Sequence, residues 1–80
     1  GMLFLFENPQ EVTFWNKNLL LPLDVIWVRD SMVVGHDTLL PESLTGIKYI
    51  SPEGATDSVI EVPEGWFLQN GINVGDRVSF

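Results

Sequence analysis

The residues best suited to chemistry are the neighbours His36 and Asp37, the only adjacent histidine and carboxylate in the chain. A catalytic dyad would need a nucleophile within reach, and Ser31, Thr38 and Ser43 lie close by in the sequence. Adjacent residues of a strand point to opposite faces, however, and the sequence has no glycine-flanked nucleophile elbow. We therefore predict no catalytic residue, and we interpret His36 as a solvated loop histidine.

Asp24 stands between two apolar residues near the start of the most apolar segment, residues 23–28. A carboxylate in such a place is costly unless it is bonded, because it loses its hydration. In a structural interpretation, Asp24 accepts backbone N–H groups of the preceding turn or pairs with Lys17 or Arg77. In a functional interpretation, it is a reactive carboxylate that lines a pocket. The residue types leave both interpretations open.

Three tryptophans are many for a chain of 80 residues. Trp27 lies inside the apolar segment, so we expect its large ring in the core. Trp15 and Trp66 lie outside this segment, and they are candidates to line a ligand surface. Together with nearby polar residues and the embedded carboxylate, they form a candidate ligand-binding set: Trp15, Lys17, Asn18, Asp24 and Trp66.

The composition excludes several classes of site and partner. Zero cysteines and one histidine leave no thiolate zinc site and no pair of imidazoles. None of the acidic residues expected in loops falls into a calcium-loop spacing: Asp30, Asp37, Glu42, Glu53 and Asp57. We predict neither a metal nor a cofactor. The net charge of −7 argues against nucleic acid and anionic lipid as partners, because binding to either needs clustered basic residues.

The start of the chain does not resemble a targeting segment. Residues 2–6 are apolar, but this run is shorter than the apolar region of a signal peptide and has no basic flank. No later run is long enough to span a bilayer. As given, the chain is expected to be soluble and cytoplasmic.

The pattern of apolar and turn-forming residues predicts a single mainly β domain over residues 1–80. The apolar run at 23–28 is typical of a central strand, and residues 32–34 are expected to return as its hairpin partner across a polar loop at 29–31. Further strands are expected at residues 3–6, 12–15, 47–50, 58–62 and 77–80, and the strands at 47–50 and 58–62 are expected to pair. A turn is expected at residues 7–10 and an irregular segment at residues 35–46. A helix is expected at residues 63–70, ended by Gly71. This set predicts a small β sandwich, jelly-roll-like fold or barrel with one short helix near the C-terminus.

Two motifs resemble the domain of unknown function 192 family. The segment Phe14-Trp15-Asn16-Lys17-Asn18, followed by Pro22-Leu23-Asp24, is similar to the family pattern Phe-Trp-Met-Lys-Asn-Thr followed by Ile-Pro-Leu-Asp. The closing segment from Val59 to Val78, with Gly65-Trp66 and Gly75-Asp76-Arg77-Val78, is similar to the end of the family domain. The chain departs from the family at Asn16, where Met is usual, and at Leu19, where Thr is usual.

The resemblance implies a compact, mainly β fold of sandwich or jelly-roll type, and no assigned activity. It also implies that many relatives are exported, which leaves the compartment of this chain open. Members of the family usually carry strand-forming segments before the position where this chain begins. Their absence would leave a sheet edge uncovered, and with the apolar residues 2–6 this predicts a homo-oligomer, most simply a dimer.

These observations favour a non-catalytic β module that binds a small ligand or a protein partner. One alternative is a small enzyme that uses Asp24 or Glu61 as acid or base and is completed by a partner chain. Another is a purely structural oligomerisation module. A pocket that holds a carboxyl group with a raised pKa would favour the enzyme, whereas an open aromatic face would favour the binding module.

Overall fold

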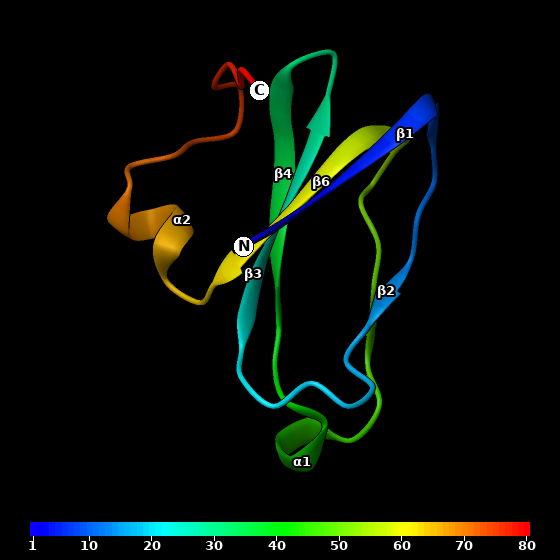
Figure 1. Ribbon diagram of the computed structural model, residues 1–80, viewed down its shortest axis with the longest axis vertical. Coiled ribbons are helices and arrows are strands. Elements are labelled where there is room, and N and C mark those ends of the chain that lie inside the picture. Colours follow the sequence, from blue (N-terminus) through cyan, green and yellow to red (C-terminus); the bar gives the residue numbers. More distant parts are fainter.

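The computed structural model describes residues 1–80 and confirms the prediction of a mainly β fold (Figure 1). Its two sheets do not close into a barrel. The elements in chain order are β1 (Met2–Gln10), β2 (Phe14–Trp15), β3 (Leu23–Arg29), β4 (Met32–Leu39), α1 (Glu42–Thr45), β5 (Tyr49–Ile50), β6 (Thr56–Pro63) and α2 (Trp66–Gln69). With four residues each, neither helix reaches the length and apolar character that crossing a membrane requires.

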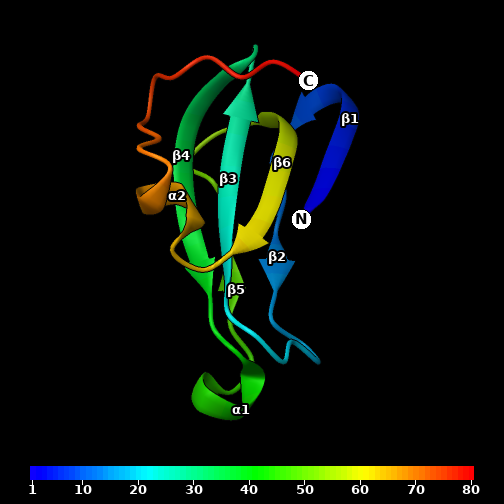
Figure 2. The same ribbon diagram turned by 60° about the vertical axis from the view of Figure 1, so that its left-hand side comes forward.

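The main sheet has four antiparallel strands in the order β1-β6-β3-β4, as Figure 2 shows. β3 lies inside the sheet, and its residues from Val25 to Val28 are all buried. This confirms the central strand that the apolar run predicts, because a strand covered on both faces carries no polar alternation. The hairpin to β4 is also confirmed, with a tight turn in which Asp30 and Ser31 both have positive φ.

Each face of the main sheet is covered by a different layer. On one face, Val25, Trp27 and Val59 pack against the small two-stranded sheet of β2 and β5 through Phe14 and Ile50. On the other face, the core residues of β3 and β4 pack against α2 and the C-terminal segment through Phe67, Ile72 and Val78. The sheet therefore separates two layers, each with its own buried core cluster.

β4 continues to Leu39, so the prediction of an irregular segment from residue 35 is wrong for its first five residues. Gly35 lies opposite Trp27 in the register, and a Cβ placed there would come within 3.3 Å of Cδ1 of the indole. The indole ring of Trp27 thus covers Gly35 and helps to maintain the pairing of β4 with β3. The following turn, α1, is a second short helix that the sequence pattern did not predict.

The pairing of the later strands also differs from the expectation. β6 pairs with β1 and β3, whereas β5 pairs with β2, so residues 47–50 and 58–62 do not form a hairpin. β1 runs on through the expected turn to Gln10, with an irregularity after Leu5. The predicted pairing of 47–50 with 58–62 is wrong because alternation in a sequence indicates which residues are buried but not which strand lies beside them.

At the C-terminal end, the predicted helix is present but shorter. Pro63 ends β6 rather than starting the helix, and α2 begins after Gly65. Gly71 has a φ of 63°, the left-handed conformation expected at the end of the helix. The predicted closing strand is wrong, because residues 77–80 form only one isolated bridge, between Met32 and Arg77.

Candidate functional site

Asp24 holds the start of α2 against the main sheet. Its Oδ2 accepts the backbone N–H groups of Gly65, at 3.0 Å, and Phe67, at 3.2 Å, and its Oδ1 accepts the hydroxyl of Thr38 at 3.3 Å. The side chain is only 6% exposed. Three donors compensate for the lost hydration of the carboxylate, which supports the structural interpretation. The donors come from α2 and β4, however, and not from the preceding turn, Lys17 or Arg77.

A small cavity of about 210 Å³ lies beside this carboxylate and is also bordered by His36 and Phe67. The two rings stack, with centroids 4.0 Å apart and planes at 19°. His36 is therefore an exposed strand residue packed on α2, and the prediction of a loop histidine is wrong because β4 extends through it.

Trp66 lies on the same side of the sheet, at the first residue of α2. It borders an apolar cavity of about 270 Å³, whose floor is formed by the buried residues Ile26 and Val33. The C-terminal segment forms another wall of this cavity with Ile72 and Val78.

Trp15, Lys17 and Asn18 lie together on the opposite layer. The Trp15 ring stacks on Tyr49 across the β2–β5 pair, with centroids 5.7 Å apart, and Nζ of Lys17 lies 5.3 Å from the Trp15 ring centroid. The backbone N–H of Asn18 donates to Oε2 of Glu42 at 2.9 Å, which ties this segment to α1. The structure therefore brings three of the five candidate residues together and places Asp24 and Trp66 on the other layer.

Asn16 is a structurally important residue that the sequence interpretation missed. It is completely buried, and its Nδ2 donates to the carbonyl oxygens of Leu40 and Gly46 at 2.9 and 3.0 Å. The same Nδ2 lies 3.1 Å from Oγ1 of Thr45, and Oδ1 accepts the backbone N–H of Lys48 at 2.8 Å. The only signal in the sequence for this role is that Asn16 replaces the Met usual in the family. A buried amide, unlike a thioether, needs hydrogen-bond partners.

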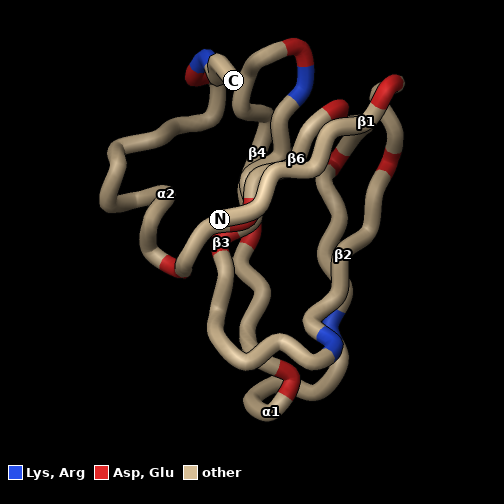
Figure 3. The backbone as a smooth tube through the Cα atoms, in the orientation of Figure 1, with Lys and Arg blue, Asp and Glu red and all other residues tan.

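These bonds fix an end of the molecule at which large apolar side chains are exposed. The segment after β2 and the segment around α1 lie side by side there, as Figures 1 and 2 both show. Leu20, Leu44 and Leu21 are 86%, 74% and 73% exposed. We call this region the α1 surface, and it consists of Trp15, Lys17, Leu20, Leu21, Leu40, Leu44, Ile47, Lys48 and Tyr49. Figure 3 shows basic residues near the lower end of β2, above α1, in a chain whose charged residues are mostly acidic.

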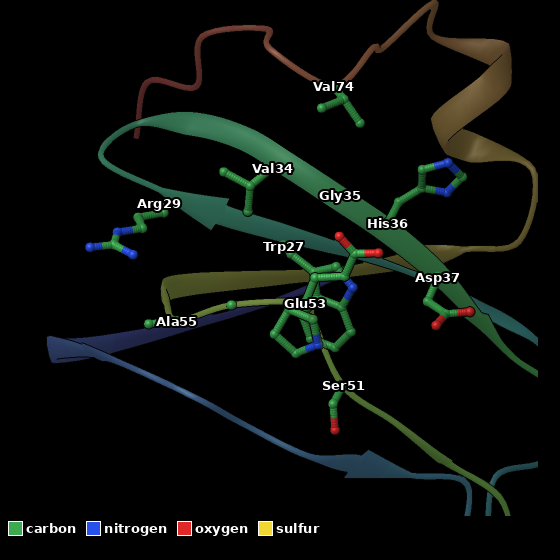
Figure 4. A pocket seen from close by; sticks show the side chains of 12 residues that line it. Trp27, Arg29, Val34, Gly35, His36, Asp37, Ser51, Glu53, Ala55 and Val74 are labelled. Atoms are coloured by element: carbon green, nitrogen blue, oxygen red, sulfur yellow. The ribbon is translucent and has the colours of Figure 1, made fainter.

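The largest cleft, about 690 Å³, lies between β4 and the connection from β5 to β6 (Figure 4). β4 contributes the segment from Val34 to Asp37, and the opposite wall consists of residues 51–55. Trp27 lies beneath, and Glu53 and Asp37 bring carboxylates to the two walls. None of the five candidate residues from the sequence lines this cleft.

The structure places each ionisable group that the sequence analysis considered for chemistry. Burial raises the pKa of Glu61, which lies between Met2 and Val25 in the sheet, but Glu61 lines none of the three cavities described here. His36 and Asp37 point to opposite sides of β4, and Oδ1 of Asp37 accepts the backbone N–H of Thr38 at 2.9 Å. No group of three or more histidine and acidic side chains is arranged to hold a metal ion.

Comparison with known proteins identifies the family of the chain but no individual relative. No curated protein and no solved structure matches it. One family model does match, over residues 1–80: DUF192, described as an uncharacterized ACR.

Proposed function

Because the chain belongs to the DUF192 family, which has no characterised activity, we propose from its geometry alone that it is a non-catalytic binding module. Its α1 surface docks a protein partner. The observation that carries this proposal is the exposure of three leucines beside the stacked pair Trp15 and Tyr49. Large apolar side chains exposed in one region usually mark an interaction site, and tryptophan and tyrosine are enriched at the centres of protein interfaces.

The charge of the α1 surface indicates what the partner presents. Two of the four basic residues of the chain, Lys17 and Lys48, belong to it, and the carboxylate of Glu42 is turned to the backbone of Asn18. A matching partner offers apolar side chains at the centre of its surface and carboxylates at the rim. Such charges orient the encounter, whereas the buried apolar side chains supply most of the affinity.

We expect substitution of the exposed leucines to abolish docking without unfolding the protein. A photoreactive amino acid at position 21 should crosslink the partner, which mass spectrometry then identifies. With the purified partner, the double variant Leu20→Asp and Leu44→Asp should raise the Kd at least about tenfold, or roughly 1.4 kcal/mol. Calorimetry measures the Kd, and thermal melting should stay unchanged because neither side chain is packed.

Leu68→Asp provides the matched control, because Leu68 is as exposed as Leu20 but lies on α2, on the other layer. This variant should bind the partner like the unsubstituted protein. A Kd that responds to Leu68→Asp and not to the double variant would contradict the assignment of the docking surface.

The proposal includes a second copy of the chain at β1. This strand is an edge of the main sheet, and its side chains Met2, Leu3 and Leu5 are exposed. An uncovered edge can pair with the same edge of another copy, and a two-fold axis closes such an assembly. Light scattering at micromolar concentration should give twice the chain mass of 9.0 kDa, and Leu5→Lys should reduce it to a single chain. A mass of one chain for the unsubstituted protein would refute the dimer.

A further inference from the structure

β4 is the other edge of the main sheet, and it is only partly covered. Near its start, the C-terminal segment lies against it through a bridge between Met32 and Arg77. The N–H of Val33 donates to the carbonyl of Asp76 at 2.9 Å, and the carbonyl of Val33 accepts the N–H of Gly75 at 2.8 Å. Beyond this point no strand pairs with the outer side of β4. The chain therefore already adds one short extended segment to this edge and leaves the rest open.

The open part of the edge faces the largest cleft. One wall of that cleft is formed by Val34, Gly35, His36 and Asp37 (Figure 4). The backbone N–H of Thr38 donates to the carboxylate of Asp37, so this N–H points away from β3. Every second residue of an edge strand faces outward, and the register shift between Val33 and Gly35 brings His36 into step with Thr38, so the N–H and C=O of His36 point away from β3.

The charges around the cleft favour a cationic side chain. Asp37 and Glu53 lie on opposite walls, and Oδ2 of Asp37 takes no part in the bond to Thr38. Arg29, at the end of the cleft, lies 3.8 Å from its neighbour Asp30, which offsets its charge. The net charge of −7 also attracts cations to the protein as a whole.

We propose that this edge binds an extended peptide segment with basic side chains, which adds to the main sheet as a further strand beside β4. Backbone hydrogen bonds at His36 would supply much of the affinity, as in other proteins that bind peptides by strand addition. Asp37 and Glu53 select lysine or arginine at alternate positions of the peptide. The cleft is separate from the α1 surface, so this binding does not depend on the partner proposed there.

The test uses three synthetic pentapeptides and the whole chain. The first is acetyl-Val-Lys-Val-Lys-Val-amide, the second has Glu in place of both lysines, and the third is the lysine peptide with alternate backbone nitrogens methylated. Calorimetry and amide chemical shifts follow the titrations. We expect the lysine peptide to shift the amides of Gly35 and His36 and to bind at least tenfold more tightly than either of the others.

Each part of the proposal has an outcome that overturns it. Equal binding of the methylated peptide would show that charge alone holds the ligand and that no strand is added. Shifts that map to β1 instead of β4 would place the binding edge elsewhere, and no binding at millimolar peptide would refute the site. Glu53→Gln should weaken the lysine peptide at least threefold, whereas Glu7→Gln, an exposed acidic residue on β1, should leave the affinity unchanged.

Discussion

Asn16→Ala should lower the free energy of unfolding by about 2–4 kcal/mol, because it removes one completely buried amide that serves several backbone groups at once. The carbonyl of Leu40 and the N–H of Lys48 lose their bonds to this side chain. The carbonyl of Gly46 keeps a donor in the hydroxyl of Thr45, at 2.8 Å. For a domain of this length the loss corresponds to a fall in Tm of roughly 8–30 °C. Urea unfolding and calorimetric melting measure both quantities.

Two further variants separate the hydrogen bonds from the other roles of this segment. Asn16→Met introduces the residue usual in the family, but a thioether cannot donate to the carbonyls of Leu40 and Gly46, so we expect a similar loss. Asn18→Gly serves as the control, since the φ of Asn18 is 62° and glycine adopts this conformation freely. It should change the stability by less than about 0.5 kcal/mol. A stable Asn16→Met variant would show that residues 40–48 satisfy their own backbone.

Asp24→Ala should cost a comparable amount, about 2–4 kcal/mol, because two N–H groups at the start of α2 lose their acceptor. With its first turn unbonded, α2 is expected to loosen from the sheet and to expose Phe67, which is buried against the main core. Urea unfolding gives the stability, and hydrogen exchange at the amides of Gly65 and Phe67 reports whether the helix opens locally.

Asp24→Asn should be milder than Asp24→Ala. The Oδ1 of the new asparagine can still accept both N–H groups. Its Nδ2 can donate to the hydroxyl of Thr38, so that this hydroxyl becomes an acceptor instead of a donor. Thr38→Val alone should lower the stability only slightly. Combined with Asp24→Asn, it leaves the new amide without an acceptor, so the double variant should lose more stability than the sum of the two single variants. Unchanged stability in Asp24→Ala, with loss of a ligand or partner, would overturn the structural role and restore the functional one.

Much of the fold follows from local patterns that the sequence displays directly. The apolar run in β3 identifies the central strand, because only a strand covered on both faces tolerates it. The turn-forming residues after it predict the hairpin to β4, and Gly71 predicts the end of α2. Trp15 and Lys17 are also among the candidate binding residues that the sequence analysis named, because an exposed tryptophan can serve as a stacking surface.

The tertiary structure alone decided which of these residues meet. Asp24 is bonded to groups 41 and 43 residues further along the chain, and the partners of the Asn16 side chain lie 24 to 32 residues away. It also decided that β6 lies between β1 and β3, that β4 continues past Gly35, and that the leucines around α1 remain exposed. Periodicity records how deeply a residue is buried, and turn chemistry records where the chain reverses. Neither records the neighbour, because strand pairing and side-chain hydrogen bonds are chosen by competition among segments that are distant in the sequence.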